Sequence, residues 1–196
     1  MIYWVLRALT VFTLRVFFGL KVEGLKNLPK KTNFIIVANH TSFLDPFVIG
    51  AAIPQRVYWL AIQEFYRSPW TRWFMLTTET LPVGNASEKL VYLLNRNRIV
   101  GLFPEGTRTH DGKLREFKRG AALLSYRTGR PIVPCAIMGA QDALPVKAKF
   151  PKFVPLKIKI GRPQYLLKEY DDQVDDVYLQ EGTLQIQNAI KEMLYA

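Results

Sequence analysis

The feature that most constrains the fold is the regular alternation of short apolar runs with longer segments of helical periodicity. The apolar runs predict strands, because buried parallel strands read as continuous hydrophobic stretches. These strands are predicted at residues 34–38, 57–62, 99–103, 132–137 and 156–160, with a weaker one at 77–83. Helices are predicted at residues 2–20, 46–52, 69–75, 86–95, 118–128 and 179–194. The alternation indicates an α/β fold in which helices flank a largely parallel, mixed sheet.

The first twenty residues are the most apolar segment, but Arg7 and Arg15 interrupt them. No uncharged run approaches the roughly 20 residues that cross a bilayer, and a signal peptide's basic start and small-residue cleavage site are missing. Aromatic residues such as Phe12 and Phe17 give the helix a broad apolar surface. We predict a helix that lies in the lipid interface while its arginines snorkel to the headgroups. The alternative is a helix packed on its own domain. Residues 1–20 are therefore assigned to a membrane-associating helix and residues 21–196 to one α/β domain.

The chain carries a formal net charge of +11, and its charge is unevenly placed. Only one of the 27 basic residues follows position 168, whereas seven of the 16 acidic residues do. Such a basic body favours an anionic partner, which can be nucleic acid, a lipid headgroup surface or a phosphorylated substrate. The stretch KAKFPKFVPLKIKIGRP, residues 147–163, interleaves lysine with apolar residues. It is typical of a strand with a solvated lysine face or of a membrane-facing surface.

The stretch NHTSFLDP places one of only two histidines, His40, just after the strand predicted at residues 34–38. Asp45 before Pro46 is typical of a helix start, with the aspartate as N-cap and the proline as first helical residue. A strand, a short loop and a helix start can bring His40 and Asp45 together. Asp45 would then accept a hydrogen bond from one imidazole nitrogen, and the other nitrogen would take a proton from a substrate hydroxyl. The alternative is an N-cap aspartate beside an incidental histidine.

A protein nucleophile is not evident near this pair. The chain has no Gly-x-Ser-x-Gly elbow, Ser42 has no independent support, and Cys135 within IVPCAI is predicted to be a core residue. The pair therefore favours direct transfer of a group to the hydroxyl of the substrate. Because two histidines and one cysteine cannot form a common zinc site without carboxylates, we expect no metal site.

A second loop, within GLFPEGTRTHDGKLREFKRGA, follows the strand predicted at residues 99–103. Gly106 permits close approach of a ligand to the backbone, and Arg108 offers a planar fork suited to phosphate. Lys118 and Arg119 are predicted to open the next helix, whose N-terminal amides also favour anions. Glu105 is a candidate to orient Arg108 or a ligand hydroxyl. The alternative is a Pro-Gly turn with a surface ion pair.

Together these motifs resemble those of the glycerolipid acyltransferase (PlsC-like) family. The segment from His40 to Asp45 is similar to the family's His-x4-Asp motif, and FPEGTR is identical to its most specific motif. IVPCAI, with Pro134, resembles its later apolar-proline motif, and FKRGA resembles its FKxGA segment. The four motifs occur in the family's order, and the resemblance covers roughly residues 20–165.

The resemblance implies transfer of a fatty acyl group from acyl-CoA or an acyl-carrier protein to the free hydroxyl of a lysophospholipid. The expected acceptor is 1-acylglycerol-3-phosphate and the expected product is phosphatidate. It implies His40 as general base with Asp45 as its partner, and no cofactor besides the acyl donor. The residues implied to bind the acceptor are Phe103, Pro104, Glu105, Gly106, Thr107, Arg108 and Lys118. The expected location is peripheral, on an anionic membrane surface at the cytoplasmic face of the cell membrane.

Two positions depart from the family pattern. Gln63 stands where a lysine is usual, and Gly84 and Asn85 stand where an acidic–arginine pair is usual. These departures leave other acceptors open, such as a different lysophospholipid or an amino-acid lipid. Two readings from other classes are a lipid-binding protein with an inactive site and a basic, non-enzymatic nucleic-acid-binding domain. Since no nucleic-acid-binding motif is present, we expect no nucleic-acid partner.

Overall fold

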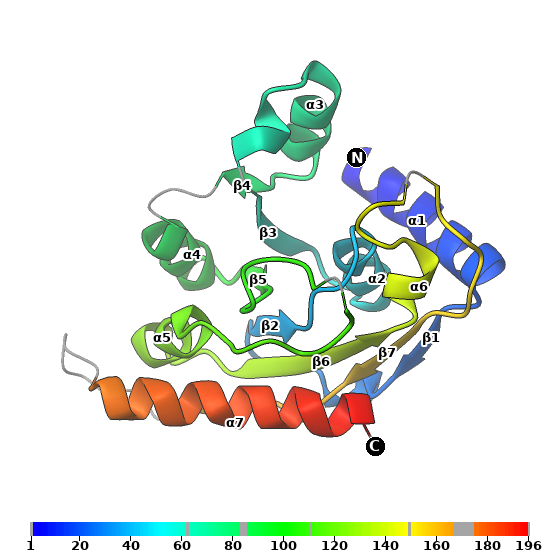
Figure 1. Ribbon diagram of the computed structural model, residues 1–196. Helices are drawn as coiled ribbons and strands as arrows, with labels where there is room; N and C mark the ends of the chain where they lie inside the picture. The colour runs from blue at the N-terminus through cyan, green and yellow to red at the C-terminus, as the bar shows by residue number, and fades with distance from the viewer. Residues whose placement is uncertain are drawn as a thin grey trace.

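The computed structural model describes residues 2–61, 63–82, 86–109, 111–148, 150–166 and 175–195. Its strands form one seven-stranded sheet in the order β1-β7-β6-β2-β5-β3-β4 (Figure 1). The strands are β1 Lys21–Glu23, β2 Ile35–Ala38, β3 Val57–Ala61, β4 Leu81–Pro82, β5 Ile99–Leu102, β6 Ile132–Met138 and β7 Lys157–Ile160. The helices are α1 Ile2–Phe18, α2 Asp45–Ala52, α3 Pro69–Thr77, α4 Ala86–Asn95, α5 Gly120–Thr128, α6 Ala140–Ala143 and α7 Asp176–Tyr195. Two 3-10 helices add η1 Leu25–Asn27 and η2 Gln63–Tyr66.

The sheet is mixed but largely parallel, as the alternating pattern predicted. Strands β2, β3, β4, β5 and β6 pair in parallel, β7 runs antiparallel to β6, and β1 runs parallel to β7. In the register of the central strands, Val37 lies opposite Leu102 of β5, and Ala38 lies opposite Cys135 of β6. The loops that follow β2 and β5 therefore leave the sheet side by side at its carboxyl edge, where sites of parallel sheets form.

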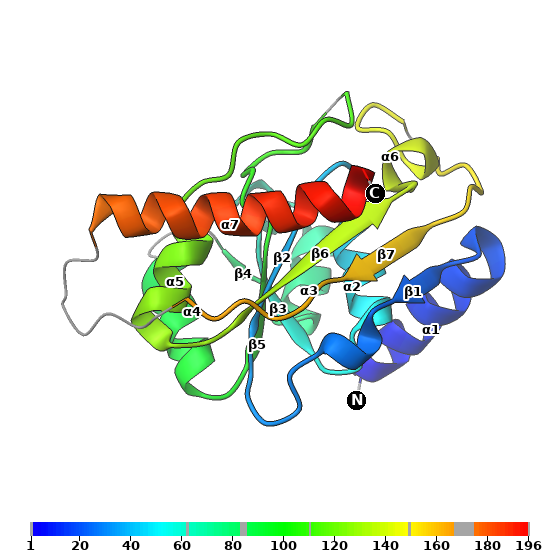
Figure 2. The same cartoon turned by 90° about the horizontal axis from the view of Figure 1, so that it is seen from below.

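Successive residues of the central strands face opposite sides of the sheet and enter two separate cores. Ile36 and Ala38 of β2 pack with α1 and α2, whereas Ile35 and Val37 pack with α4, α5 and α7. Figures 1 and 2 show the same layers, with α5 and α7 on one side of the sheet and α1 and α2 on the other. Both faces are covered, so the central strands are continuous apolar runs rather than alternating ones.

Some boundaries of the observed elements differ from the predicted ones. Helix α5 begins at Gly120 and not at Lys118, because the backbone amide of Lys118 donates to the carbonyl of Pro104 and stays in the loop. The weaker strand shrinks to Leu81–Pro82, because α3 continues as far as Thr77. The unpredicted elements β1, η1, η2 and α6 each span three or four residues, too few for a period to be read.

Helix α1 packs on the domain with one face. Leu14 and Phe18 are buried in the core that α1 shares with α2. Arg7 does not snorkel: its Nε donates to the carbonyl of Gly50 at 3.0 Å, and its Nη2 donates to that of Ile53 at 3.0 Å. Arg7 thus satisfies carbonyls at the end of α2 that lack helical partners. The prediction of two snorkelling arginines was wrong for this residue.

The opposite face of α1 is apolar and exposed. Val5, Leu9, Phe12 and Val16, spaced four, three and four residues apart, each leave 59–60% of their surface accessible. Among the helices of the described residues, none is long and apolar enough to cross a membrane. The alternative of a helix packed on its own domain therefore holds for one face of α1, and the interfacial helix stays a prediction for the exposed face.

Candidate active site

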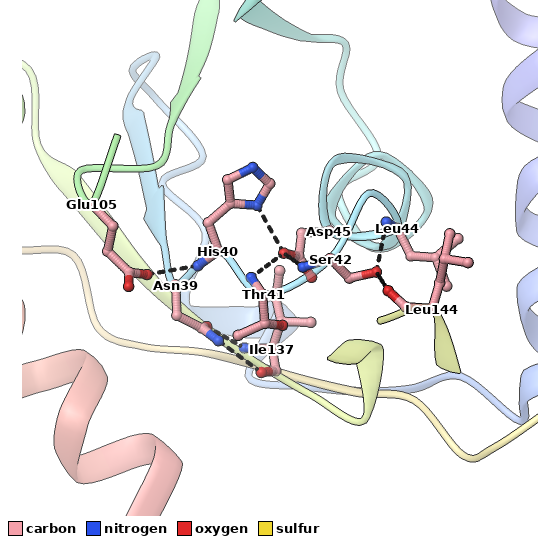
Figure 3. A network of polar contacts seen from close by, with 9 residues as sticks. All are labelled: Asn39, His40, Thr41, Ser42, Leu44, Asp45, Glu105, Ile137 and Leu144. Atoms are coloured by element: carbon pink, nitrogen blue, oxygen red, sulfur yellow. Dashed lines mark hydrogen bonds and ion pairs between the residues drawn. The ribbon is translucent and has the colours of Figure 1, made fainter. Parts of the chain in front are cut away.

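The site begins where β2 ends. The side chain of Asn39 continues the pairing of β2 with β6, since its Oδ1 accepts from the Ile137 amide at 2.8 Å and its Nδ2 donates to the Ile137 carbonyl at 3.0 Å (Figure 3). Both contacts are buried. The side chain of Asn39 therefore makes the contacts to β6 that a backbone would otherwise make, and the backbone turns away from the sheet at His40.

His40 and Asp45 form the predicted pair. The Nδ1 atom of His40 lies 2.9 Å from Oδ2 of Asp45, which is fully buried. The same oxygen accepts from the backbone amides of Thr41 at 2.7 Å and Ser42 at 2.8 Å. Because these amides can only donate, this oxygen is an acceptor, and Nδ1 carries the proton of the neutral ring. The second ring nitrogen points away from Asp45 (Figure 3) and keeps its lone pair for an incoming proton.

Asp45 is not the helix cap that its sequence context suggested. It is the first residue of α2, Leu44 holds the cap position, and no side chain caps the helix. The carboxylate instead turns back into the loop to the Thr41 and Ser42 amides. This local arrangement fixes the loop between His40 and Asp45 and holds the carboxylate against the imidazole.

The imidazole of His40 is the end of a stack of three rings. The His40 and Phe103 rings lie 4.0 Å apart at an interplanar angle of 14°, and the Phe103 and Trp59 rings lie 5.0 Å apart at 11°. Gly101 makes room for this column, because a Cβ at that position would come within 2.4 Å of the Trp59 ring. Phe103 was predicted from its motif, but Trp59 was not, since nothing in its sequence context distinguishes it from other strand residues.

Glu105 connects the loop that follows β5 to the loop that follows β2 through hydrogen bonds. It is buried, with Oε1 accepting from the backbone amide of His40 at 2.7 Å and Oε2 from that of Arg115 at 3.0 Å. Burial raises the pKa of Glu105, and the two amide hydrogen bonds oppose that rise. The amide of Thr109 also donates to the His40 carbonyl at 2.9 Å. Both carboxylate oxygens of Glu105 thus have backbone partners, and this geometry positions His40.

Two cations, Arg108 and Lys118, lie at the loop that follows β5. The guanidinium of Arg108 lies 3.4 Å over the Phe43 ring, and its buried Nη1 has no hydrogen-bond partner among the described residues. Burial lowers the pKa of Arg108, whereas the charge of Asp45 raises it. Lys118 reaches the same loop, since a Cβ on Gly106 would lie 2.7 Å from its Nζ. Pro104 is buried, while Gly106 and Thr107 are exposed.

Neither Ser42 nor Cys135 is placed to react as a nucleophile. Ser42 is fully buried, and its hydroxyl donates to the carbonyl of Leu144 at 2.8 Å. Cys135 is a core residue, as predicted, and burial raises the pKa of its thiol to about 12. Of the positions that depart from the family pattern, Gln63 is exposed in η2, whereas Gly84 and Asn85 lie outside the described residues.

Comparison with known proteins identifies similar sequences and a similar structure. The family model described as Acyltransferase matches residues 19–138. The 1-acyl-sn-glycerol-3-phosphate acyltransferase of Bacillus subtilis (strain 168) is 32% identical over 152 residues, which cover 74% of this chain and 73% of that protein. The 1-acyl-sn-glycerol-3-phosphate acyltransferase alpha of Homo sapiens is 30% identical over 145 residues, which cover 68% of this chain. The chain spans 51% of this human protein and 40% of a chloroplastic relative from Brassica napus.

The fold is shared with a solved structure. The crystal structure of the 1-acyl-sn-glycerophosphate (LPA) acyltransferase PlsC from Thermotoga maritima superposes with a TM-score of 0.73 at 23% sequence identity. The match covers 95% of this chain and 80% of the Thermotoga chain. The α/β architecture with its largely parallel sheet is therefore that of a known fold.

Proposed function

Because this chain belongs to the Acyltransferase family, we propose that it transfers a fatty acyl group from an acyl thioester to the free hydroxyl of 1-acylglycerol-3-phosphate, forming phosphatidate. The relatives named for this reaction support the acceptor and the product. The donor is proposed to be acyl-CoA or an acyl-carrier protein. The observation that carries the proposal is the His40–Asp45 pair at the carboxyl edge of the sheet.

In the proposed reaction His40 acts as the general base. Its Nε2 takes the proton of the acceptor hydroxyl while the hydroxyl oxygen forms a bond to the carbonyl carbon of the thioester. The carbon–sulfur bond then breaks, and the departing sulfur takes the proton from His40 and leaves as a thiol. The buried carboxylate of Asp45, 2.9 Å from Nδ1, would stabilise the imidazolium between these two proton transfers.

Acceptor recognition is assigned to the cations of the second loop. Arg108 supports this role best, because it is part-buried next to the pair and has an unpartnered guanidinium nitrogen. A guanidinium can bind phosphate through two parallel hydrogen bonds. The exposed Lys118 would add positive charge, and the backbone at Gly106 and Thr107 would approach the acceptor. Phe103, Pro104 and Glu105 would instead position the base and its loop.

We further propose that the protein works at an anionic membrane surface, as a peripheral protein on its cytoplasmic face. The exposed apolar face of α1 supports this location, because patches of large apolar residues in solvent mark interaction surfaces. A basic body complements anionic lipids. Residues 1–20 would be the membrane-associating helix and residues 21–196 the acyltransferase domain, although α1 also contributes Leu14 and Phe18 to the core.

The test is a turnover assay of the purified protein on a panel of lysophospholipids, with acyl-CoA and acyl-carrier protein as separate donors. We expect lysophosphatidate to be the preferred acceptor. His40→Ala should lower turnover by about 10²–10⁴-fold, the usual contribution of a general base, with an unchanged melting temperature. Cys135→Ala is the matched control and should retain turnover, because Cys135 is buried in the core. Wild-type turnover of folded His40→Ala would refute the mechanism.

A further inference from the structure

Two phenylalanines project from the connection between α6 and β7. Phe150 leaves 81% of its surface exposed and Phe153 leaves 68%. Most large apolar side chains of a folded domain are covered by their neighbours, so two such rings within four residues are unusual at a surface with no partner. Two exposed lysines belong to the same connection: Lys147 precedes both rings and Lys152 lies between them in the sequence.

This connection is fixed to the end of α1. The Phe153 ring lies 5.5 Å from the ring of Phe17 and 5.3 Å from that of Phe18. The backbone amide of Leu156 donates to the carbonyl of Phe18 at 2.9 Å, and the amide of Lys21 donates back to the carbonyl of Leu156 at 2.9 Å. Both views show the connection running beside α1, although the two segments are far apart in the sequence (Figures 1 and 2).

The two segments together make one apolar surface, here called the α1–loop surface. Its α1 part is the exposed row Val5, Leu9, Phe12 and Val16 with Phe17, and its loop part is Phe150 and Phe153. The contact between Phe17 and Phe153 makes the surface continuous. The buried Phe18 beneath Phe153 anchors the loop part to the core.

Three exposed cations border this surface, and none of them forms an ion pair among the described residues. Arg15, Lys147 and Lys152 are exposed and form no ion pair within the part of the chain that the structure describes. Glu23, which follows α1, is already paired with Lys157 at 2.7 Å. Aromatic tips bordered by free cations match the boundary between acyl chains and anionic headgroups.

We propose that Phe150 and Phe153 insert into the lipid interface beside α1 as a second anchor, while Arg15, Lys147 and Lys152 contact anionic headgroups. This inference rests on the proposed function, whose acceptor is a membrane lipid. A single helix lying on a bilayer can roll about its own axis. A second contact beside the end of α1 would stop that rotation and fix how the domain faces the membrane. Strongly projecting rings suit a fluid interface, whereas a folded protein partner would need a matching pocket for each ring.

The experiment measures vesicle binding of the full chain to phosphatidylcholine vesicles with and without added phosphatidylglycerol. Phe150→Ser with Phe153→Ser should weaken binding to both kinds of vesicle by at least about tenfold, because two large apolar side chains would no longer be transferred from water into the lipid. Lys147→Gln with Lys152→Gln should weaken binding only to the anionic vesicles, by about fivefold per cation. The matched control is Tyr165→Ser with Tyr195→Ser, which removes two aromatics of 68% and 65% exposure outside the α1–loop surface. It should bind like the wild type.

Unchanged vesicle binding of the double phenylalanine variant would overturn the proposal. Turnover in detergent micelles gives a second readout, and it should remain at the wild-type level for all of these variants. If the phenylalanine variant instead bound vesicles normally but turned over slowly with acyl-carrier protein alone, the surface would be a docking site for that acidic protein. Absence of acyltransferase activity in the wild type would refute the proposed function, and vesicle binding would still decide the role of the surface.

Discussion

Replacing Asp45 with Asn tests how the carboxylate acts on His40. Oδ2 of Asp45 accepts three hydrogen bonds, from the His40 ring at 2.9 Å and from the Thr41 and Ser42 amides at 2.7 and 2.8 Å. The two amides can only donate, so they should hold the oxygen of Asn at the same place. The ring would keep its tautomer, and only the negative charge beside it would be lost.

The magnitude follows from the difference between charged and neutral hydrogen bonds. A hydrogen bond to a charged group contributes about 1.5–3 kcal/mol net and a neutral one about 0.5–1.5 kcal/mol. The imidazolium formed during the reaction should therefore lose about 1–2 kcal/mol of stabilisation, and kcat should fall about 5- to 30-fold. The new amide nitrogen would occupy the place of Oδ1, which is buried without a hydrogen-bond partner among the described residues. Its burial should lower the free energy of unfolding by about 1–3 kcal/mol.

The assay compares Asp45→Asn and Asp45→Ala by steady-state turnover on lysophosphatidate and by urea unfolding. Asp45→Ala removes all three hydrogen bonds at once, so it should be both less stable and less active than Asp45→Asn. Wild-type kcat for Asp45→Asn would refute a role for the charge. A loss near the full 10²–10⁴-fold of general-base catalysis in folded protein would show that the ring had changed tautomer. That outcome would refute the argument that the two amides fix the oxygen.

Two further predictions concern the stack and the acceptor cation. Gly101→Ala should displace Trp59, because the new Cβ would come within 2.4 Å of its ring. The strain should lower the free energy of unfolding by about 1–3 kcal/mol and should also lower kcat. Adding Trp59→Leu to this variant should restore stability but not kcat. Unchanged kcat in the single and the double variant would exclude a role for the ring stack. Arg108→Lys should raise the KM for lysophosphatidate about 10- to 150-fold with little change for a phosphate-free acceptor, since one charged hydrogen bond contributes about 1.5–3 kcal/mol. Equal KM values for the two proteins would place the phosphate elsewhere.

The sequence predicted the sheet well because the central strands are buried on both faces. Ile35, Ile36 and Val37 are all fully buried, so each must be apolar, and the run stands out whatever the rest of the chain does. The His40–Asp45 pair was also predictable, because a strand end, a short loop and a helix start bring residues five apart together without help from distant segments. Local patterns were sufficient for these features.

The contacts that position His40 could not be predicted in the same way. The Glu105 carboxylate bonds to the His40 amide 65 residues away, and Arg7 bonds to the Gly50 carbonyl 43 residues away. A carboxylate before a glycine is typical of ligand binding and of backbone support alike, and only the register of β2 against β5 decides between them. The Trp59–Phe103 contact depends in addition on the missing side chain of Gly101. Such pairings follow from the assembled sheet.

The position of Arg7 links helix α1 to the His40–Asp45 pair. Helix α2 begins with Asp45 and ends at Ala52, and the carbonyls of Gly50 and Ile53 at its far end accept from Arg7. At 1.5 Å per residue this helix is about 12 Å long. One short, rigid element thus joins the carboxylate that holds His40 to the helix proposed to lie on the membrane. The length of α2 would then set the distance between His40 and the lipid surface. An acceptor whose acyl chain stays in the bilayer would need to raise its hydroxyl only by that distance.

Because α1 also contacts α2 and the core, removing residues 1–20 would leave carbonyls of α2 unpaired and the core without Leu14 and Phe18. Membrane binding therefore has to be tested by substitutions on the exposed face of α1.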